Sequence, residues 1–238
     1  MFGDIGNIMF GDIGNINLSE DKELNVFLLT NSKPNDHDKI INRLILSSSE
    51  TILCSGWLKL EGINMVLPSI ICAAKKGADI TLFSNKGETG AACSCDARWE
   101  FKRPKESVKD WLNRREEYCS CTGVAKKVIG KLEQTSKQHP NFKYVIIENL
   151  NKHMHQKLYY FKKNDEFIAI IGSGNITEGG LDTNEELSIG LSGVVGSYSH
   201  KEIVKYLDKM NDKLHSNDGV ELDGWKFIDR IAAGGLFN

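Results

Sequence analysis

Short apolar segments with a strand-like pattern alternate with segments of helical pattern along most of the chain. The strand-like segments lie at residues 26–29, 51–57, 79–83, 144–147, 154–161, 167–171 and 187–191. Apolar residues at helical spacing occupy residues 38–46, 63–76 and 201–214, and Ser199 with Glu202 is placed to form a capping box for the last helix. Strands that alternate with helices predict an α/β fold with a mixed, mostly parallel sheet flanked by helices.

A polar stretch at residues 85–142 interrupts this alternation. Its helical patterns near residues 108–118 and 124–136 predict a partly helical insertion. The chain has 238 residues, of which 40% are hydrophobic, and this is enough for one substantial core. We therefore predict one domain over residues 25–238 that carries this insertion.

The segment before this domain, residues 1–24, contains a duplicated octapeptide. The sequence MFGDIGNI occurs at residues 1–8 and again at residues 9–16. One duplication of eight residues is too short for a solenoid repeat. We interpret the segment as an N-terminal tail, and an alternative start at Met9 or a cloning artefact remains open.

Positive charge is concentrated in the middle of the chain, although the formal net charge is only −2. Residues 96–143 carry twelve Lys and Arg residues against seven Asp and Glu residues. The aromatic residues Trp99, Phe101, Trp111 and Tyr118 lie between these charges. Nucleic-acid surfaces combine cations with stacking aromatics in this way, but an ordinary helical excursion with solvated lysines would give the same composition.

No stretch of the sequence resembles a membrane span. A run of about eighteen apolar residues is absent, and the N-terminus has neither a basic segment nor a long apolar one. These absences favour a cytoplasmic protein with no membrane partner.

Four of the six cysteines form two C-x-C pairs within the polar insertion. Cys93 and Cys95 make the first pair, and Cys119 and Cys121 make the second. Four thiolates can hold a structural zinc tetrahedrally and stabilise a region that has a poor core. Free thiols are the alternative, and disulfides are disfavoured in a reducing compartment.

The most informative chemistry lies between residues 155 and 186. His155 and Lys157 are two apart, so a strand would place a nucleophile or acid beside a fixed positive charge. After another apolar segment, the glycine-flanked Gly172-Ser173-Gly174-Asn175 offers backbone N–H groups and two short polar side chains to an oxyanion. Glu186 follows eleven residues after Asn175.

This ordered set resembles the phospholipase D superfamily, whose signature is H-x-K followed by G-[SG]-x-N. The run IIGSGNITEGGLDTNEELSI is most similar to the nuclease branch, which includes metal-independent restriction endonucleases. One position departs from the signature, because Lys162 stands where many members carry an Asp. In the nuclease branch a later Glu takes over that orienting role, which the resemblance assigns to Glu186 rather than to its neighbour Glu185.

The resemblance implies a two-step displacement at phosphorus that needs no metal and no other cofactor. His155 would attack to form a phosphohistidine, and water would then release the product. Lys157 and Asn175 would hold the non-bridging oxygens with help from Ser173, and Glu186 would accept a hydrogen bond from the other ring nitrogen of His155. The resemblance covers one complete signature, with its H-x-K at residues 155–157, so it implies a homodimer in which the second histidine acts as the general acid.

The sequence therefore predicts a metal-independent phosphodiesterase that cleaves nucleic acid, with DNA as the favoured substrate, in a restriction or defence system. A phospholipid head-group hydrolase or transferase is the competing enzymatic interpretation, but no amphipathic docking element is evident. A nucleic-acid-binding module with an idle site is the third interpretation.

Overall fold

The computed structural model describes residues 24–32, 36–85, 121–148, 155–215 and 220–222. The strands are β1 (Asn25–Thr30), β2 (Glu50–Ser55), β3 (Asp79–Asn85), β4 (Phe142–Glu148), β5 (Lys157–Lys163), β6 (Glu166–Gly172), β7 (Leu187–Val194) and β8 (Val220–Leu222). The helices are α1 (His37–Ser47), α2 (Leu60–Lys75), α4 (Cys121–Gln138), the short π-helix η4 (Gly179–Thr183) and α5 (Tyr198–His215). Each strand and helix predicted within the described residues is present, with boundaries that differ by a few residues.

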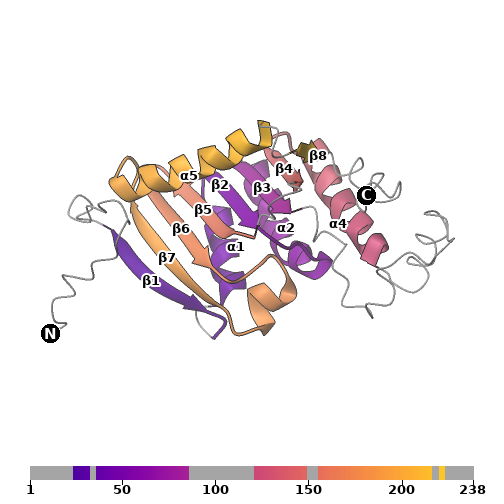
Figure 1. The fold of residues 1–238 in the computed structure, drawn as a ribbon, viewed down its shortest axis with the longest axis horizontal. Helices are drawn as coiled ribbons and strands as arrows, with labels where there is room; N and C mark the ends of the chain where they lie inside the picture. The colour runs from indigo at the N-terminus through magenta and orange to yellow at the C-terminus, as the bar shows by residue number, and fades with distance from the viewer. Residues whose placement is uncertain (1–23, 33–35, 86–120, 149–154, 216–219, 223–238) are drawn as a thin grey trace, which may run out of the picture.

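All described strands belong to one eight-stranded sheet in the order β1-β7-β6-β5-β2-β3-β4-β8. Figure 1 shows α5 along one face of this sheet, with α1 and α2 on the opposite face. The predicted α/β class, a mixed sheet flanked by helices, is confirmed.

The expectation of a mostly parallel arrangement is wrong for the pairing of neighbouring strands. Only β2–β3 and β3–β4 pair in parallel, and the other described pairs are antiparallel. β5 and β6 are joined by only Asn164 and Asp165, and a two-residue connection forces antiparallel pairing. Asn164 has a φ of 53°, the left-handed conformation that such a turn requires.

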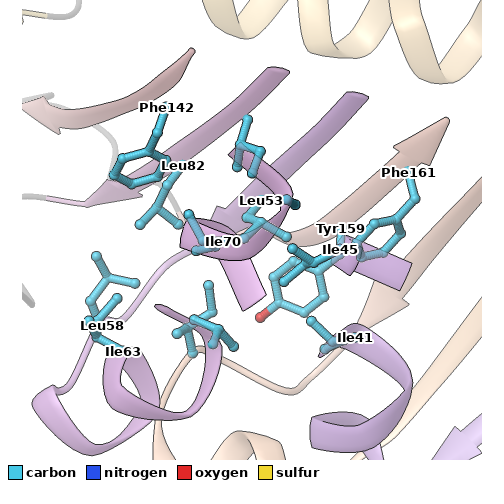
Figure 2. Close-up of a cluster of buried hydrophobic side chains, with 14 of the residues drawn as sticks. Ile41, Ile45, Leu53, Leu58, Ile63, Ile70, Leu82, Phe142, Tyr159 and Phe161 are labelled. Atoms are coloured by element: carbon cyan, nitrogen blue, oxygen red, sulfur yellow. The ribbon is translucent and has the colours of Figure 1, made fainter. Parts of the chain in front are cut away.

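Two clusters of buried side chains hold the helices to the sheet. Figure 2 shows the larger one, in which Ile41 and Ile45 of α1 lie near Tyr159 and Phe161 of β5. The smaller cluster joins Ile203 and Leu207 of α5 to the opposite face of the sheet. Burial of each aliphatic side chain contributes about 1.5–3 kcal/mol to the free energy of folding. The clusters on the two faces of the sheet therefore fix the position of the central strands.

Helix α4 occupies the later part of the predicted insertion, and it packs into the larger cluster through Val128 and Leu132. It connects the parallel strands β3 and β4, which need a long crossover connection. Cys121–Gln138 therefore serves as a crossover helix of the main fold. The helix predicted near residues 108–118 lies outside the described residues, and the domain boundaries stay a prediction.

Two local predictions need correction. Helix α5 begins at Tyr198, and Ser197 Oγ accepts the N–H of His200 at 3.3 Å, so Ser197 caps the helix in place of Ser199. Gly196, with φ 93°, turns the chain into this cap. Strand β5 starts at Lys157, so His155 precedes the strand that was predicted to contain it.

Candidate active site

The predicted site residues lie around one end of the central sheet. β2 and β6 run toward this end, while β5 and β7 start from it, because β5 is antiparallel to β2 and β6 is antiparallel to β7. Lys157 pairs with Ser55, the last residue of β2, and Gly172 pairs with Ser188 near the start of β7. His155, Ser173, Asn175 and Glu186 therefore all extend from strand ends that lie side by side.

His155 and Lys157 are in direct contact. The Lys157 Nζ lies 3.0 Å from His155 Nδ1 and 3.5 Å from Nε2, and it donates to the His155 carbonyl oxygen at 2.8 Å. An ammonium group can only donate, so the ring nitrogen that receives it carries a lone pair. Lys157 is 9% exposed, whereas His155 is an exposed residue. The predicted placement of His155 beside Lys157 is thus present.

Asn175 is held against the turn that follows β2. Its Oδ1 accepts the N–H of Trp57 at 3.1 Å, which leaves the amide Nδ2 as a donor with no hydrogen-bond partner among the described residues. The next residue, Ile176, donates its N–H to Ser55 Oγ at 2.9 Å. Because Gly56 N–H also donates to the Gln156 carbonyl at 3.1 Å, the same turn carries both Asn175 and the start of β5. An amide donor at the same sheet end as a lysine and a histidine suits a phosphoryl oxygen.

Ser173 and Glu186 form a pair of their own. The Ser173 hydroxyl donates to Glu186 Oε2, and the N–H of Leu187 donates to Ser173 Oγ at 3.2 Å. The hydrogen bond expected between Glu186 and His155 is not formed in this structure, and the described partner of the carboxylate is the serine hydroxyl. The Ser173 N–H donates to the Leu187 carbonyl at 3.2 Å, so this backbone donor is already used and does not face an oxyanion.

Glycine is required at position 172 by the close approach of β7. A Cβ on Gly172 would overlap Ser188 Oγ and would lie 2.6 Å from the Leu187 carbonyl oxygen. The glycines of this loop were predicted to let an oxyanion approach the backbone. At Gly172 the structure instead shows close packing of the chain against itself.

We expect Gly172→Ala to lower the free energy of unfolding by about 3 kcal/mol, because backbone atoms must shift to admit the methyl group. Gly130 in α4 is the matched control, since a Cβ there would meet nothing within 4 Å. Gly130→Ala should leave stability unchanged or raise it by about 0.5–1 kcal/mol. Urea denaturation of both variants measures the difference, and equal midpoints would contradict the packing described.

Two residues that support the site were not predicted. Tyr159 is buried, and its hydroxyl donates to the Gly174 carbonyl at 2.7 Å, while burial raises its pKa. His37, the first residue of α1, contacts Ser188 at the start of β7 (2.8 Å between Nε2 and Oγ). His37 begins the triplet His37-Asp38-Lys39, which also fits H-x-K, but Ser188 lies 151 positions away, so this local pattern carries no signal for the contact.

The proposed zinc ligands lie almost entirely outside the described residues. Cys93, Cys95 and Cys119 fall in residues 86–120, and of Cys121 only the helical backbone is described. The part of the chain that is described contains no cluster of three or more His, Cys, Asp or Glu side chains suited to a metal. Most of the basic, aromatic segment also lies outside the described residues.

Among the described helices, none is both long and apolar enough to span a bilayer.

Comparisons with known proteins agree with this fold. The family model described as cardiolipin synthase, PLD-like domain, matches residues 40–211. Nuc, a phospholipase D family member from Salmonella typhimurium, is 12% identical with a TM-score of 0.52, and the match covers 84% of this chain and 99% of that one. Phosphatidylserine synthase from Haemophilus influenzae is 11% identical with a TM-score of 0.55, and the match covers 84% of this chain and 40% of that one. No curated protein matches the sequence.

The fold and the matched family model place this chain in the PLD-like phosphodiesterase superfamily. The chain belongs to the PLD-like domain family, and the predicted membership of the phospholipase D superfamily is confirmed. The solved structures share the fold at low identity, so they do not decide which phosphodiester is the substrate.

Proposed function

We propose that this protein is a metal-independent nuclease that cleaves nucleic acid, with DNA as the favoured substrate, through a phosphohistidine at His155. The observation that carries the proposal is the contact of His155 with Lys157 at 3.0 Å, at the same sheet end as the Asn175 amide. These groups supply a nucleophile and two donors for the non-bridging oxygens, and none of them is a metal ligand in this role.

In the first step, a ring nitrogen of His155 attacks phosphorus and the bond from phosphorus to the leaving oxygen breaks. The ammonium of Lys157 and the Nδ2 of Asn175 bind the non-bridging oxygens, whose negative charge increases in the transition state. The leaving oxygen takes a proton from a general acid. In the second step, water attacks the phosphohistidine, its proton returns to that same group, and the P–N bond breaks.

The general acid in this proposal is His155 of the partner subunit in a homodimer. The described residues offer an apolar sheet face that a second copy can cover. Leu28, Ile189 and Ile171 are directly opposite one another on β1, β7 and β6, and their exposed fractions are 60%, 46% and 45%. Leu187, which adjoins Glu186, extends this face to the site and is 57% exposed. A partner that covers this face therefore lies beside the site that lacks a second histidine.

We expect the double variant Leu28→Lys, Ile189→Lys to be monomeric, because a charge on each subunit cannot be buried in an apolar interface without a counter-ion. Light scattering after gel filtration should give about twice 26.6 kDa for the native chain and 26.6 kDa for the variant, with loss of hydrolysis. Leu46→Lys is the matched control, since Leu46 is an exposed leucine (39%) on α1. A native chain that is monomeric and active would overturn the dimer.

The test of the proposed function compares substrates in the presence of EDTA. Supercoiled plasmid, single-stranded RNA and phosphatidylcholine vesicles are incubated with the protein at equal phosphodiester concentration. Nicking or cutting of the plasmid that survives chelation supports a nuclease. Cleavage of foreign DNA alone, when the protein acts in a cytoplasmic extract, would support a restriction or defence role. Hydrolysis of the lipid alone would favour the head-group hydrolase, and binding without turnover would favour an idle module.

A further inference from the structure

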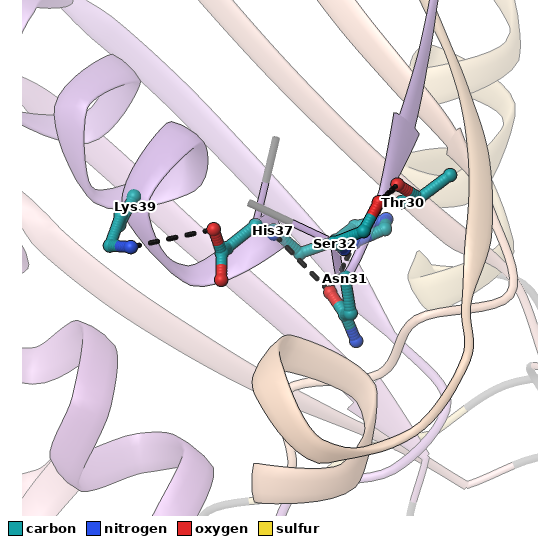
Figure 3. A network of polar contacts seen from close by, with 6 residues as sticks. Thr30, Asn31, Ser32, His37 and Lys39 are labelled. Atoms are coloured by element: carbon teal, nitrogen blue, oxygen red, sulfur yellow. Dashed lines mark hydrogen bonds and ion pairs between the residues drawn. The ribbon is translucent and has the colours of Figure 1, made fainter. Parts of the chain in front are cut away.

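His37 connects three segments of the site without being exposed to the substrate. Its side chain is fully buried at the start of α1. Nδ1 lies 2.7 Å from Asn31 Oδ1, which follows β1, and Nε2 lies 2.8 Å from Ser188 Oγ of β7. Figure 3 shows the ring of His37 beside Asn31.

The hydrogen bonds define the protonation state of the ring. Asn31 Nδ2 donates to the Asn184 carbonyl at 2.7 Å, so the amide oxygen of Asn31 faces His37. The same oxygen also accepts the backbone N–H of His37 at 3.3 Å. A carbonyl oxygen cannot donate, so Nδ1 of His37 carries the proton. In the neutral ring, Nε2 then accepts a hydrogen bond from the Ser188 hydroxyl. Burial lowers the pKa of His37, although the charge of nearby Glu186 acts in the opposite direction, and the ring is thus neutral near pH 7.

Both connections end two residues from Glu186. Asn184 precedes Glu186 by two positions and is held through Asn31, while Ser188 follows it by two positions and is held directly. His37 also lies under the loop that carries Asn175, since a Cβ on Gly174 would be 3.6 Å from its Cδ2. One ring thereby fixes the chain on both sides of Glu186, the partner of Ser173.

We propose that His37 is a positioning residue that sets the location of Glu186, and through it Ser173, at the phosphate site. This inference rests on the proposed phosphodiester hydrolysis. Burying an imidazole costs free energy that an apolar side chain would not. Two directional hydrogen bonds to segments that flank the site offset this cost and fix those segments more narrowly than apolar packing does.

The test is a double-mutant cycle between His37→Leu and Glu186→Gln, with hydrolysis of bis(4-nitrophenyl) phosphate in EDTA as the readout. Leucine keeps the burial but removes both ring hydrogen bonds. We expect His37→Leu to lower kcat about tenfold with KM changed less than about twofold, and to lower kcat less than about twofold in the Glu186→Gln background. Ser188→Ala removes only the Nε2 bond and serves in place of His37→Leu if that variant does not fold.

A merely structural role predicts a different result. The inference would be overturned if His37→Leu lowered kcat by the same factor with native Glu186 and with Glu186→Gln. It would also be overturned if neither His37→Leu nor Ser188→Ala changed kcat. Both outcomes would leave the proposed function in place. Failure of the proposed function is distinguishable, because then the native chain would not hydrolyse the ester or His155→Ala would hydrolyse it equally well.

Discussion

His155→Ala should lower kcat for phosphodiester hydrolysis by at least about 10³-fold, the largest effect expected of any single substitution in this chain. In the proposed dimer the change removes both the nucleophile of one subunit and the general acid of the other. His155 is an exposed residue, so loss of its ring should leave the thermal unfolding midpoint unchanged within about 1 °C. The measurement is the initial rate of plasmid nicking in EDTA, with circular dichroism melting to check the fold.

The control for this substitution is His139→Ala. His139 lies in the turn between α4 and β4, away from the site end of the sheet, and the hydrogen bonds described for it involve only its backbone. Its variant should cleave at the native rate. Residual EDTA-resistant cleavage by His155→Ala within tenfold of the native rate would mean that another group is the nucleophile.

Lys157→Met is expected to lower kcat by about 10²–10³-fold, because methionine keeps the apolar stem but removes the cation that binds the non-bridging oxygens. Lys157 is only 9% exposed, and a charge in a partly dehydrated site stabilises the transition state more than a solvated one does. Rates on bis(4-nitrophenyl) phosphate measure the effect without the binding contribution of a polyanion.

The matched control is Lys162→Met at the far end of the same strand. Lys162 forms an ion pair with Glu50 at 3.3 Å, and both side chains are more than a third exposed, so the pair contributes little to stability. This variant should retain the native kcat. Equal losses in the two lysine variants would indicate a general effect of charge on β5 and would remove Lys157 from the site.

Much of the fold was predictable because buried strands and amphipathic helices leave clear local patterns. Val26 to Leu29 and Phe167 to Ile171, for example, lie within β1 and β6. The order of the strands has no such local pattern. β1 pairs with β7 near the other end of the domain, and this antiparallel contact depends on the whole fold. The expectation of mostly parallel pairing failed partly for that reason, and partly because it did not take account of the two-residue Asn164-Asp165 connection that makes β5 and β6 antiparallel.

The site was predictable where chemistry and spacing coincide in sequence. His155 and Lys157 are two residues apart, and the structure brings them into contact. The partner of Glu186 was not predictable, because a carboxylate binds whichever donor the backbone places nearby, and β7 places it beside Ser173. His37 begins a second H-x-K triplet, but that triplet does not predict the contacts of its ring, and only the folded chain shows its two hydrogen bonds.

The most direct test of the proposed chemistry is detection of the covalent intermediate. The protein is mixed with a short DNA oligonucleotide in EDTA, quenched within milliseconds in alkaline denaturant, which preserves the P–N bond, and digested for mass spectrometry. A peptide that carries a nucleotide adduct on His155, absent from His155→Ala, is the result that a phosphohistidine mechanism predicts. Rapid cleavage without an adduct at any quench time, or an adduct on a different residue, would contradict it.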